Sequence, residues 1–157
     1  MRWLVLLHVV LAFWLVAGFV GRNLTMARAR STHDLHVLVA LSELAGRFER
    51  LMVIPGSVAV LVAGLLKAFA QDRSFTGSGN WWLLLSLILF LALIPLVPFV
   101  FRPRGCVFER ALTEAKQRRE VTAELAAAQR DPVVAAARTT ELAVVAVIVM
   151  LMVVKPF

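Results

Sequence analysis

An uninterrupted apolar stretch at residues 81–101, WWLLLSLILFLALIPLVPFVF, constrains this chain more than any other feature. It contains no ionisable side chain and lies between Asn80 and Arg102. At about 1.5 Å of rise per residue, a helix of this length crosses the roughly 30 Å hydrocarbon core of a bilayer. The sequence therefore predicts a transmembrane helix here, and every other apolar run has to be considered as a further crossing.

Three further apolar runs predict three more spans, at about residues 3–21, 51–70 and 135–154. We expect the first to be a retained span, because it is too long for the apolar region of a cleaved signal peptide. The last is free of charge only over residues 142–154, about 20 Å of helix, so it must begin near Ala135 and carry Glu141 inside the membrane boundary. Hydrophobic residues make up 61% of the chain, against roughly half in a soluble domain, so one membrane domain accounts for residues 1–157. These observations predict an all-α, polytopic membrane protein: a four-helix transmembrane bundle with up-down-up-down topology.

Two charged segments, at about residues 32–50 and 106–130, have the periodicity of amphipathic helices. Ser31 and Asp34 have the spacing of a capping box, which places the start of the first of these helices near Thr32. Their charge predicts that both lie outside the membrane. We expect them to be cytoplasmic, next to the inner ends of the spans.

Prolines predict where the spans bend. Pro55 lies near the start of the second span and should kink it, because proline removes a helical hydrogen bond and clashes with the preceding turn. Pro95 and Pro98 should bend the third span in its second half. Pro103 and Gly105 are expected to break that helix just past the membrane.

The basic residues predict the orientation. Arg22 begins an expected interfacial loop after the first span. Residues 22–50 hold 5 Lys and Arg and residues 102–138 hold 8, whereas the opposite side holds the remaining 4 of 17. The positive-inside rule places both basic regions in the cytoplasm and both termini outside, in a multi-pass protein of the bacterial inner membrane. Topology thus accounts for the net charge of +7, and we expect no nucleic-acid partner.

His8 is the first candidate for chemistry, because an ionisable residue inside a span is costly and often functional. A neutral imidazole there could ligate haem iron. The alternative is a histidine that hydrogen bonds to a neighbouring helix near the interface. Lys67 is expected at a similar depth on the same outer side, as an interfacial polar residue that extends its amine outward.

Glu141 is the second candidate. Arg47, Arg50 and Arg102 lie near the same inner boundary and are its expected partners. A proton or ion path would need a relay of such groups through the membrane, and the sequence offers only one. We therefore favour an interhelical ion pair.

Other residue types give no catalytic or metal site. Met150 and Met152 could bind Cu(I) by softness, but two residues apart on a helix they point roughly 200° apart. The single cysteine, Cys106, can form no internal disulfide and has no zinc-type spacing to other ligands. The chain has no glycine-rich phosphate loop, no GxSxG motif and no HExxH motif, which excludes the common soluble enzyme classes.

Several segments together resemble a known family. They are LHVV around His8, ERLMVIPGSVAVLVAGL entering the second span, the Asp131–Pro132 pair before the last span, and the closing MLMVVKPF. The whole chain resembles an uncharacterised, domain-of-unknown-function family of bacterial predicted integral membrane proteins. That family is distantly similar to the copper-resistance protein D and HemJ-type four-helix membrane proteins. The resemblance implies a first-span histidine in haem or metal binding, which is His8 here.

The resulting functional hypothesis is a noncatalytic accessory or scaffold subunit of a larger membrane assembly, whose partners are the lipid bilayer and other membrane subunits or further copies of the chain. One alternative is a redox or haem-handling protein that binds haem b through His8. A second alternative is a transporter of small ions or copper.

Overall fold

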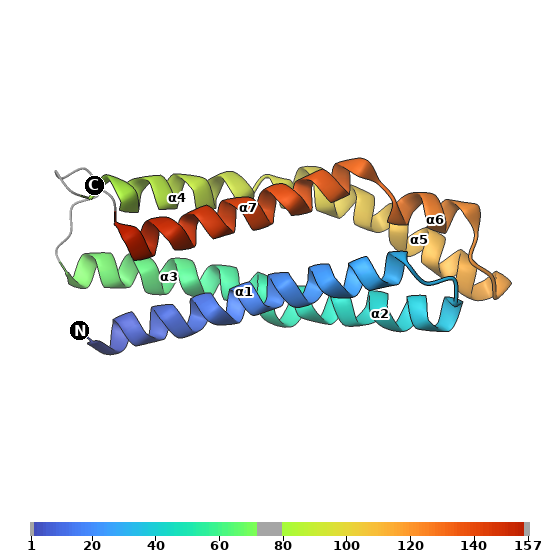
Figure 1. The fold of residues 1–157 in the computed structure, drawn as a ribbon, viewed down its shortest axis with the longest axis horizontal. Coiled ribbons are helices and arrows are strands. Elements are labelled where there is room, and N and C mark those ends of the chain that lie inside the picture. The colour runs from blue at the N-terminus through green and yellow to red at the C-terminus, as the bar shows by residue number, and fades with distance from the viewer. Residues whose placement is uncertain (1, 72–79, 156–157) are drawn as a thin grey trace.

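The computed structural model describes residues 2–71 and 80–155, and every regular element in those two ranges is helical (Figure 1). Two of the elements, η1 and η2, are single π-helical turns that continue directly into the α-helix that follows. In chain order the elements are α1 (Arg2–Arg30), α2 (Leu35–Phe48), η1 (Glu49–Val53), α3 (Ile54–Ala70), α4 (Trp81–Leu93), η2 (Val97–Phe101), α5 (Arg102–Arg118), α6 (Ala123–Gln129) and α7 (Pro132–Val154).

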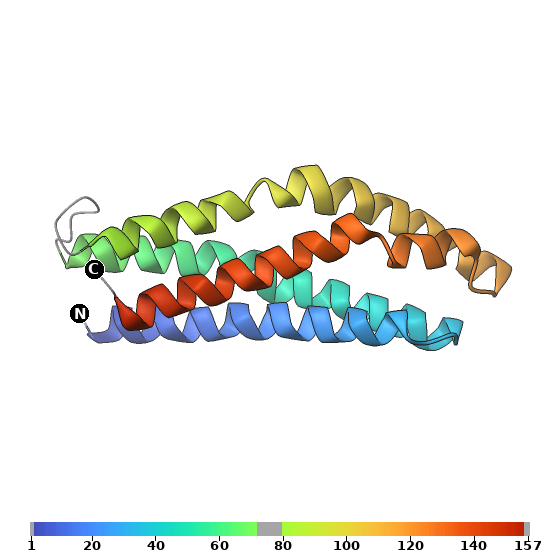
Figure 2. The same cartoon turned by 45° about the horizontal axis from the view of Figure 1, so that its top comes forward.

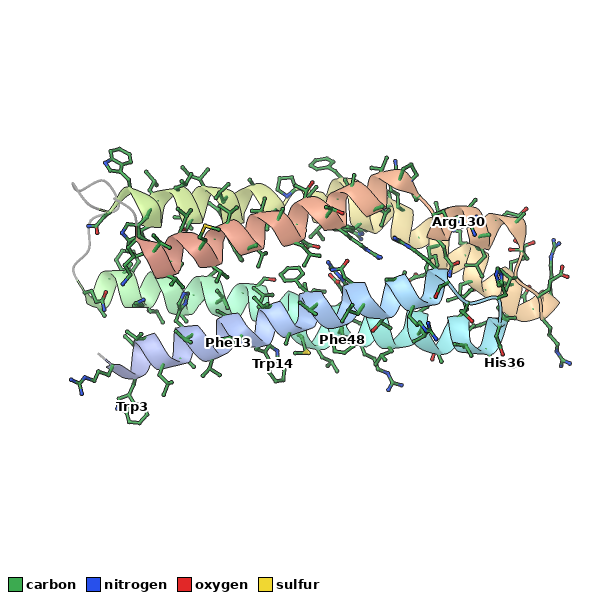
Figure 3. All side chains as sticks on the ribbon, in the orientation of Figure 1. Trp3, Phe13, Trp14, His36, Phe48 and Arg130 are labelled. Atoms are coloured by element: carbon green, nitrogen blue, oxygen red, sulfur yellow. The ribbon has the colours of Figure 1, made fainter. Side chains whose placement is uncertain are left out.

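Four helical stretches are long and apolar enough to cross a membrane, namely Arg2–Arg30, Leu35–Ala70, Trp81–Arg118 and Ala123–Val154. The predicted all-α, four-span fold is therefore confirmed. The outer face of α1 shows the kind of surface that a bilayer requires: Trp3 and Trp14 point away from the other helices (Figure 3), and each exposes half or more of its area. Such a surface would be costly in water and is favourable against lipid chains.

The helices form two layers (Figures 1 and 2). In one layer α1 packs along α2 and α3, and in the other α4 packs along α7. The layers meet in a buried apolar cluster of Leu15, Phe19 and Val53, against which Phe90, Leu142 and Val145 pack. The start of α1 and the end of α7 lie at the same end of the molecule (Figure 1), as an even number of antiparallel spans requires.

At the opposite end α2, α5, α6 and the last turns of α1 form a second unit, which we call the head (Figure 1). The head has its own core of Leu38, Ala111, Ala115 and Leu125. An ion pair between Lys116 Nζ and Glu43 Oε1, 3.0 Å apart, joins α5 to α2 on its surface. The head therefore folds against itself while its helices continue into the spans.

The first helix is longer than the predicted span, because α1 continues through Arg22 to Arg30, where the sequence predicts an interfacial loop. Charge alone does not end a helix, and no proline or glycine follows Gly21 before Ser31. The start of α2 also differs from the expected position near Thr32. Asp34 is the N-cap, and its carboxylate accepts hydrogen bonds from the backbone N–H groups of the second and third residues after it.

One of the proline predictions is confirmed, at Pro95, and one is contradicted, at Pro103. The third span is interrupted at Pro95, between the end of α4 and η2. The predicted break at Pro103 and Gly105 is wrong, because α5 continues through both residues. Pro55 and Pro103 each lie two residues after a π turn, so the residue whose carbonyl would clash with the proline ring lies inside that turn. The wider turn accommodates the ring and lets the helix continue.

The amphipathic segment predicted at 106–130 forms two helices, α5 and α6. Arg119 ends α5 in a left-handed conformation, with φ of 58°, and the chain then turns back. Thr122 starts α6, its hydroxyl accepting a hydrogen bond from the N–H of Leu125. The reversal places Leu125 in the head core.

Candidate functional site

A buried arginine lies where the two layers approach each other. Arg22, on α1, exposes only 4% of its surface. One terminal nitrogen of its guanidinium group donates to Oε2 of Glu49, 2.5 Å away, and the other donates to Oε2 of Glu141. Glu49 belongs to η1 and Glu141 to α7, so one side chain connects three elements of both layers.

Aromatic rings cover the same guanidinium group. Its central carbon lies 5.2 Å from the centre of the Phe19 ring and 5.8 Å from that of Phe101. Phe101 is the last residue of η2, whereas Glu49 is the first of η1. Both π turns therefore place a side chain against Arg22. Single π turns inside α-helices are often found at functional sites, which makes the surroundings of Arg22 a candidate site.

The arrangement satisfies the electrostatic requirements of a buried arginine. The N–H donors of a guanidinium group point in fixed directions in one plane, so its two terminal nitrogens can each bind a different carboxylate. Removing one partner of such a buried pair typically costs about 3–5 kcal/mol, because the other charge stays buried without compensation. We call Arg22, Glu49 and Glu141 the ion-pair cluster.

The second polar feature lies toward the other end of the bundle, at His8. The imidazole packs on α3, where a Cβ added to Gly64 would lie 3.0 Å from His8 Cε1. A side chain at this position would require the imidazole ring to shift by a few tenths of an ångström. Among the described residues, His8 Nδ1 is buried and has no hydrogen-bond partner. An unsatisfied buried nitrogen of this kind calls for an explanation.

His8 also lies at the junction of two cavities. The larger, of about 320 Å³, is lined by apolar residues of α1, α3, α4 and α7 and by Ser86, whose hydroxyl is engaged with the Trp82 carbonyl at 2.7 Å. The smaller, of about 150 Å³, is lined by Lys67 and Lys155. The residues that line both cavities are His8, Gly64, Leu83 and Met152.

The chain matches, over residues 2–156, the family described as predicted integral membrane protein (DUF2269). It belongs to that family. The match confirms the predicted resemblance to a domain-of-unknown-function family of integral membrane proteins, and the protein is an integral membrane protein. No curated protein and no solved structure matches the chain.

In this member of the DUF2269 family, the sequence-predicted polar residues lie apart. His8 and Lys67 line the smaller cavity, whereas Glu141 lies in the ion-pair cluster. Arg50 is exposed, and its Nε donates to the Gly46 carbonyl 3.3 Å away. Arg102 is also exposed at the start of α5. The partner of Glu141 is therefore Arg22, and not Arg47, Arg50 or Arg102 as the sequence suggested.

Sequence reasoning missed Arg22 because it treated this residue as the end of the first span. A signal was present nevertheless. In the sequence, apolar residues on both sides of Arg22 have the spacing of one helix face, and Arg22 occupies a position in this series: Leu15, Phe19, Arg22, Met26 and Ala29. The series shows both that the helix continues and that Arg22 faces inward.

Proposed function

We propose that this protein is a noncatalytic accessory or scaffold subunit of a membrane assembly, which presents its head to a partner protein. The observation that carries the proposal is the continuity between spans and head. The stretches Leu35–Ala70 and Trp81–Arg118 have 36 and 38 residues, about 54 and 57 Å at roughly 1.5 Å per residue, against a hydrocarbon core of roughly 30 Å. Each helix thus projects well beyond the membrane.

The head is held firmly relative to the spans, which suits a docking platform. Its core joins α2 to α5 and α6, while the ion-pair cluster joins the two layers beneath it. Its surface also mixes both signs of charge, as in the exposed ion pair of Arg118 with Glu114 at 2.6 Å. A mixed charged surface favours contact with another protein more than insertion into lipid. In the orientation that the positive-inside rule favours, this head faces the cytoplasm of a bacterial inner membrane.

Cys106 provides the test, because it is exposed on α5. A photoactivatable maleimide attached to Cys106 in native membranes should yield one discrete protein adduct of larger mass. The matched control is Cys106→Ser combined with Leu91→Cys, which moves the probe to an exposed apolar position on α4. That control should give mainly lipid adducts. A monomeric protein that forms no protein adduct from Cys106 would overturn the proposal.

A haem-binding role is the second candidate, favoured by the unpartnered Nδ1 of His8 beside the larger cavity. His8 on α1 and Met152 on α7 line the same cavity, and an imidazole nitrogen and a thioether sulfur are both ligands that could hold a haem iron there. Lys67 and Lys155 line the adjoining cavity, where positive charge would suit the haem carboxylates. Bound haem would supply one-electron chemistry.

One ultraviolet-visible absorption spectrum distinguishes the haem-binding role from the scaffold role. The protein, purified after growth with added haem, should show a Soret band that His8→Ala removes and that His36→Ala, at an exposed histidine near the start of α2 (Figure 3), leaves in place. A featureless spectrum of the wild type would exclude the haem role and leave the scaffold proposal untouched.

A further inference from the structure

Two arginines near the ion-pair cluster have no partner of their own. Arg30 lies at the end of α1 and Arg138 in the second turn of α7. In each, Nε is buried without a hydrogen-bond partner. Within residues 2–71 and 80–155 neither side chain takes part in an ion pair. Both residues are half-buried, and a buried N–H donor without an acceptor is unusual in a protein, so these two guanidinium groups call for an acceptor.

The neighbouring carboxylates do not supply that charge. Arg138 lies about one helical turn before Glu141 on α7, and its charge interacts with those of Arg22, Arg30 and Glu49. Both carboxylates already accept hydrogen bonds from Arg22. Three positive groups therefore share two negative ones, which leaves one uncompensated positive charge between α1 and α7.

The position of the excess charge indicates the ligand. Arg30 is the last residue of α1 and Arg138 lies near the start of α7, so both are at the end of the bundle that carries the head, where a span would leave the apolar core of a bilayer. Guanidinium groups suit phosphate oxygens, because their planar donors can bind two oxygens at once. Basic pockets between transmembrane helices at this depth bind anionic lipid headgroups.

We propose that Arg30 and Arg138 form a binding site for a phosphate-bearing anion between α1 and α7. The site goes beyond the scaffold role and needs no partner protein. The phosphate comes either from an anionic phospholipid of the leaflet nearest the head or from a soluble phosphate compound. Either would bring the missing negative charge to the ion-pair cluster.

Native mass spectrometry of the delipidated full-length protein in detergent tests the site. Phosphatidylglycerol should bind more tightly than phosphatidylcholine, which has the same phosphate but no net charge. Arg30→Gln and Arg138→Gln should each weaken phosphatidylglycerol binding roughly fivefold, as expected for about 1 kcal/mol per basic residue. Arg47→Gln is the matched control, since it removes the same charge from an exposed position on α2 and should leave binding within twofold.

Competition with inorganic phosphate distinguishes a phospholipid from a soluble phosphate compound as the source of the phosphate. If inorganic phosphate displaces phosphatidylglycerol, the site recognises a free phosphate, and if it does not, the site recognises a lipid headgroup. Arg138→Lys keeps the positive charge but lacks the planar donors of a guanidinium group. It should bind phosphatidylglycerol more weakly than the wild type and more tightly than Arg138→Gln. The comparison of Arg138→Lys with the wild type tests recognition even if the glutamine variant unfolds. Equal loss in the Arg47 control, or binding unchanged in Arg30→Gln and Arg138→Lys, would overturn the proposal.

Discussion

Arg22 joins three helical elements through a single guanidinium group, so its replacement should have consequences far from α1. Arg22→Leu leaves Glu49 and Glu141 without their partner, and Glu141 is buried, with 6% of its surface exposed. We expect the variant to lose about 3–5 kcal/mol of stability, the usual cost of an uncompensated buried charge. Thermal unfolding in detergent measures this.

The same prediction has an internal control. Arg47→Leu removes an exposed arginine and should change the melting temperature little. The combined replacement of Arg22 by Met and of Glu49 and Glu141 by Leu removes all three charges and should recover most of the lost stability, because no charge then remains buried. A single Arg22 variant as stable as the Arg47 control would show that the ion-pair cluster contributes nothing.

The charge of Asp131, at the start of α7, should make the stability of the protein depend on pH. The hydrogen bond from the Arg104 guanidinium, with help from the N–H groups of Val133 and Val134, lowers the pKa of Asp131 below its ordinary value of 3.8. Because the folded state has the lower pKa, this stabilisation is complete above pH 3.8 and is lost as the pH falls through the folded pKa.

The variant Asp131→Asn isolates this charge, because asparagine also caps helices. The melting temperature of the wild type should exceed that of the variant at about pH 6, and the difference should shrink toward about pH 3. We expect a small difference, since the Arg104 side chain is 40% exposed and solvent screens the pair. A gap that stays constant across this range would contradict the assignment.

At the scale of the elements, glycines set how closely α1 approaches its neighbours. A Cβ added at Gly18 would lie 2.7 Å from the Cβ of Met52, and one added at Gly21 would lie 2.7 Å from Cε1 of Phe48. Small residues allow such close contact between membrane helices. The register of α1 against α2 and η1 therefore depends on these two positions.

Gly18→Leu should push α1 away from η1 and destabilise the protein by about 1–3 kcal/mol or more, as overpacking does. Gly105→Ala is the matched control, because a Cβ there meets nothing within 4 Å and α5 is helical. That change should be neutral or stabilise by about 0.4–1 kcal/mol. Melting temperatures of the two variants in the same detergent decide the question, and equal effects would refute the close-contact interpretation.

Some elements could be predicted from sequence because their causes are local. The length of an apolar run predicts a span, and the missing N–H of Pro95 predicts an interruption. Pro55 and Pro103 show the limit of this reasoning. A proline in a helix can produce a kink or a wider turn, and which one forms depends on what the side chains before it can contact. Here Glu49 and Phe101 contact Arg22, which lies on another helix and could not be placed without the fold.

At the scale of the whole molecule, the partners of buried groups are the part that sequence alone could not supply. Glu141 was expected to pair across helices, but Arg22 lies 119 positions away and was assigned to a loop. The two cavities beside His8 likewise arise from how four helices pack, and the sequence shows only that His8 lies in a span.

The orientation of the molecule can be measured with Cys106. If the head is cytoplasmic, a membrane-impermeant maleimide should label Cys106 in inside-out vesicles and leave it unlabelled in right-side-out vesicles, because the residue is exposed on α5. A cysteine introduced at exposed Trp3, near the start of α1, in a Cys106→Ser background should show the reverse pattern. Labelling of Cys106 only in right-side-out vesicles would place the head outside.

The π turns also indicate where a residue can be deleted from a helical stretch of this chain. A π turn closes its hydrogen bond over five residues where an α turn uses four, so η1 and η2 each hold one residue more than an ordinary helix needs there. Deleting one residue within Glu49–Val53, together with Pro55→Ala, would let α2 and α3 run as one uninterrupted helix with the face of each half preserved. The turn at Glu49–Val53 is therefore a place where this bundle can lose a single residue without rotating either half of the span out of its packing.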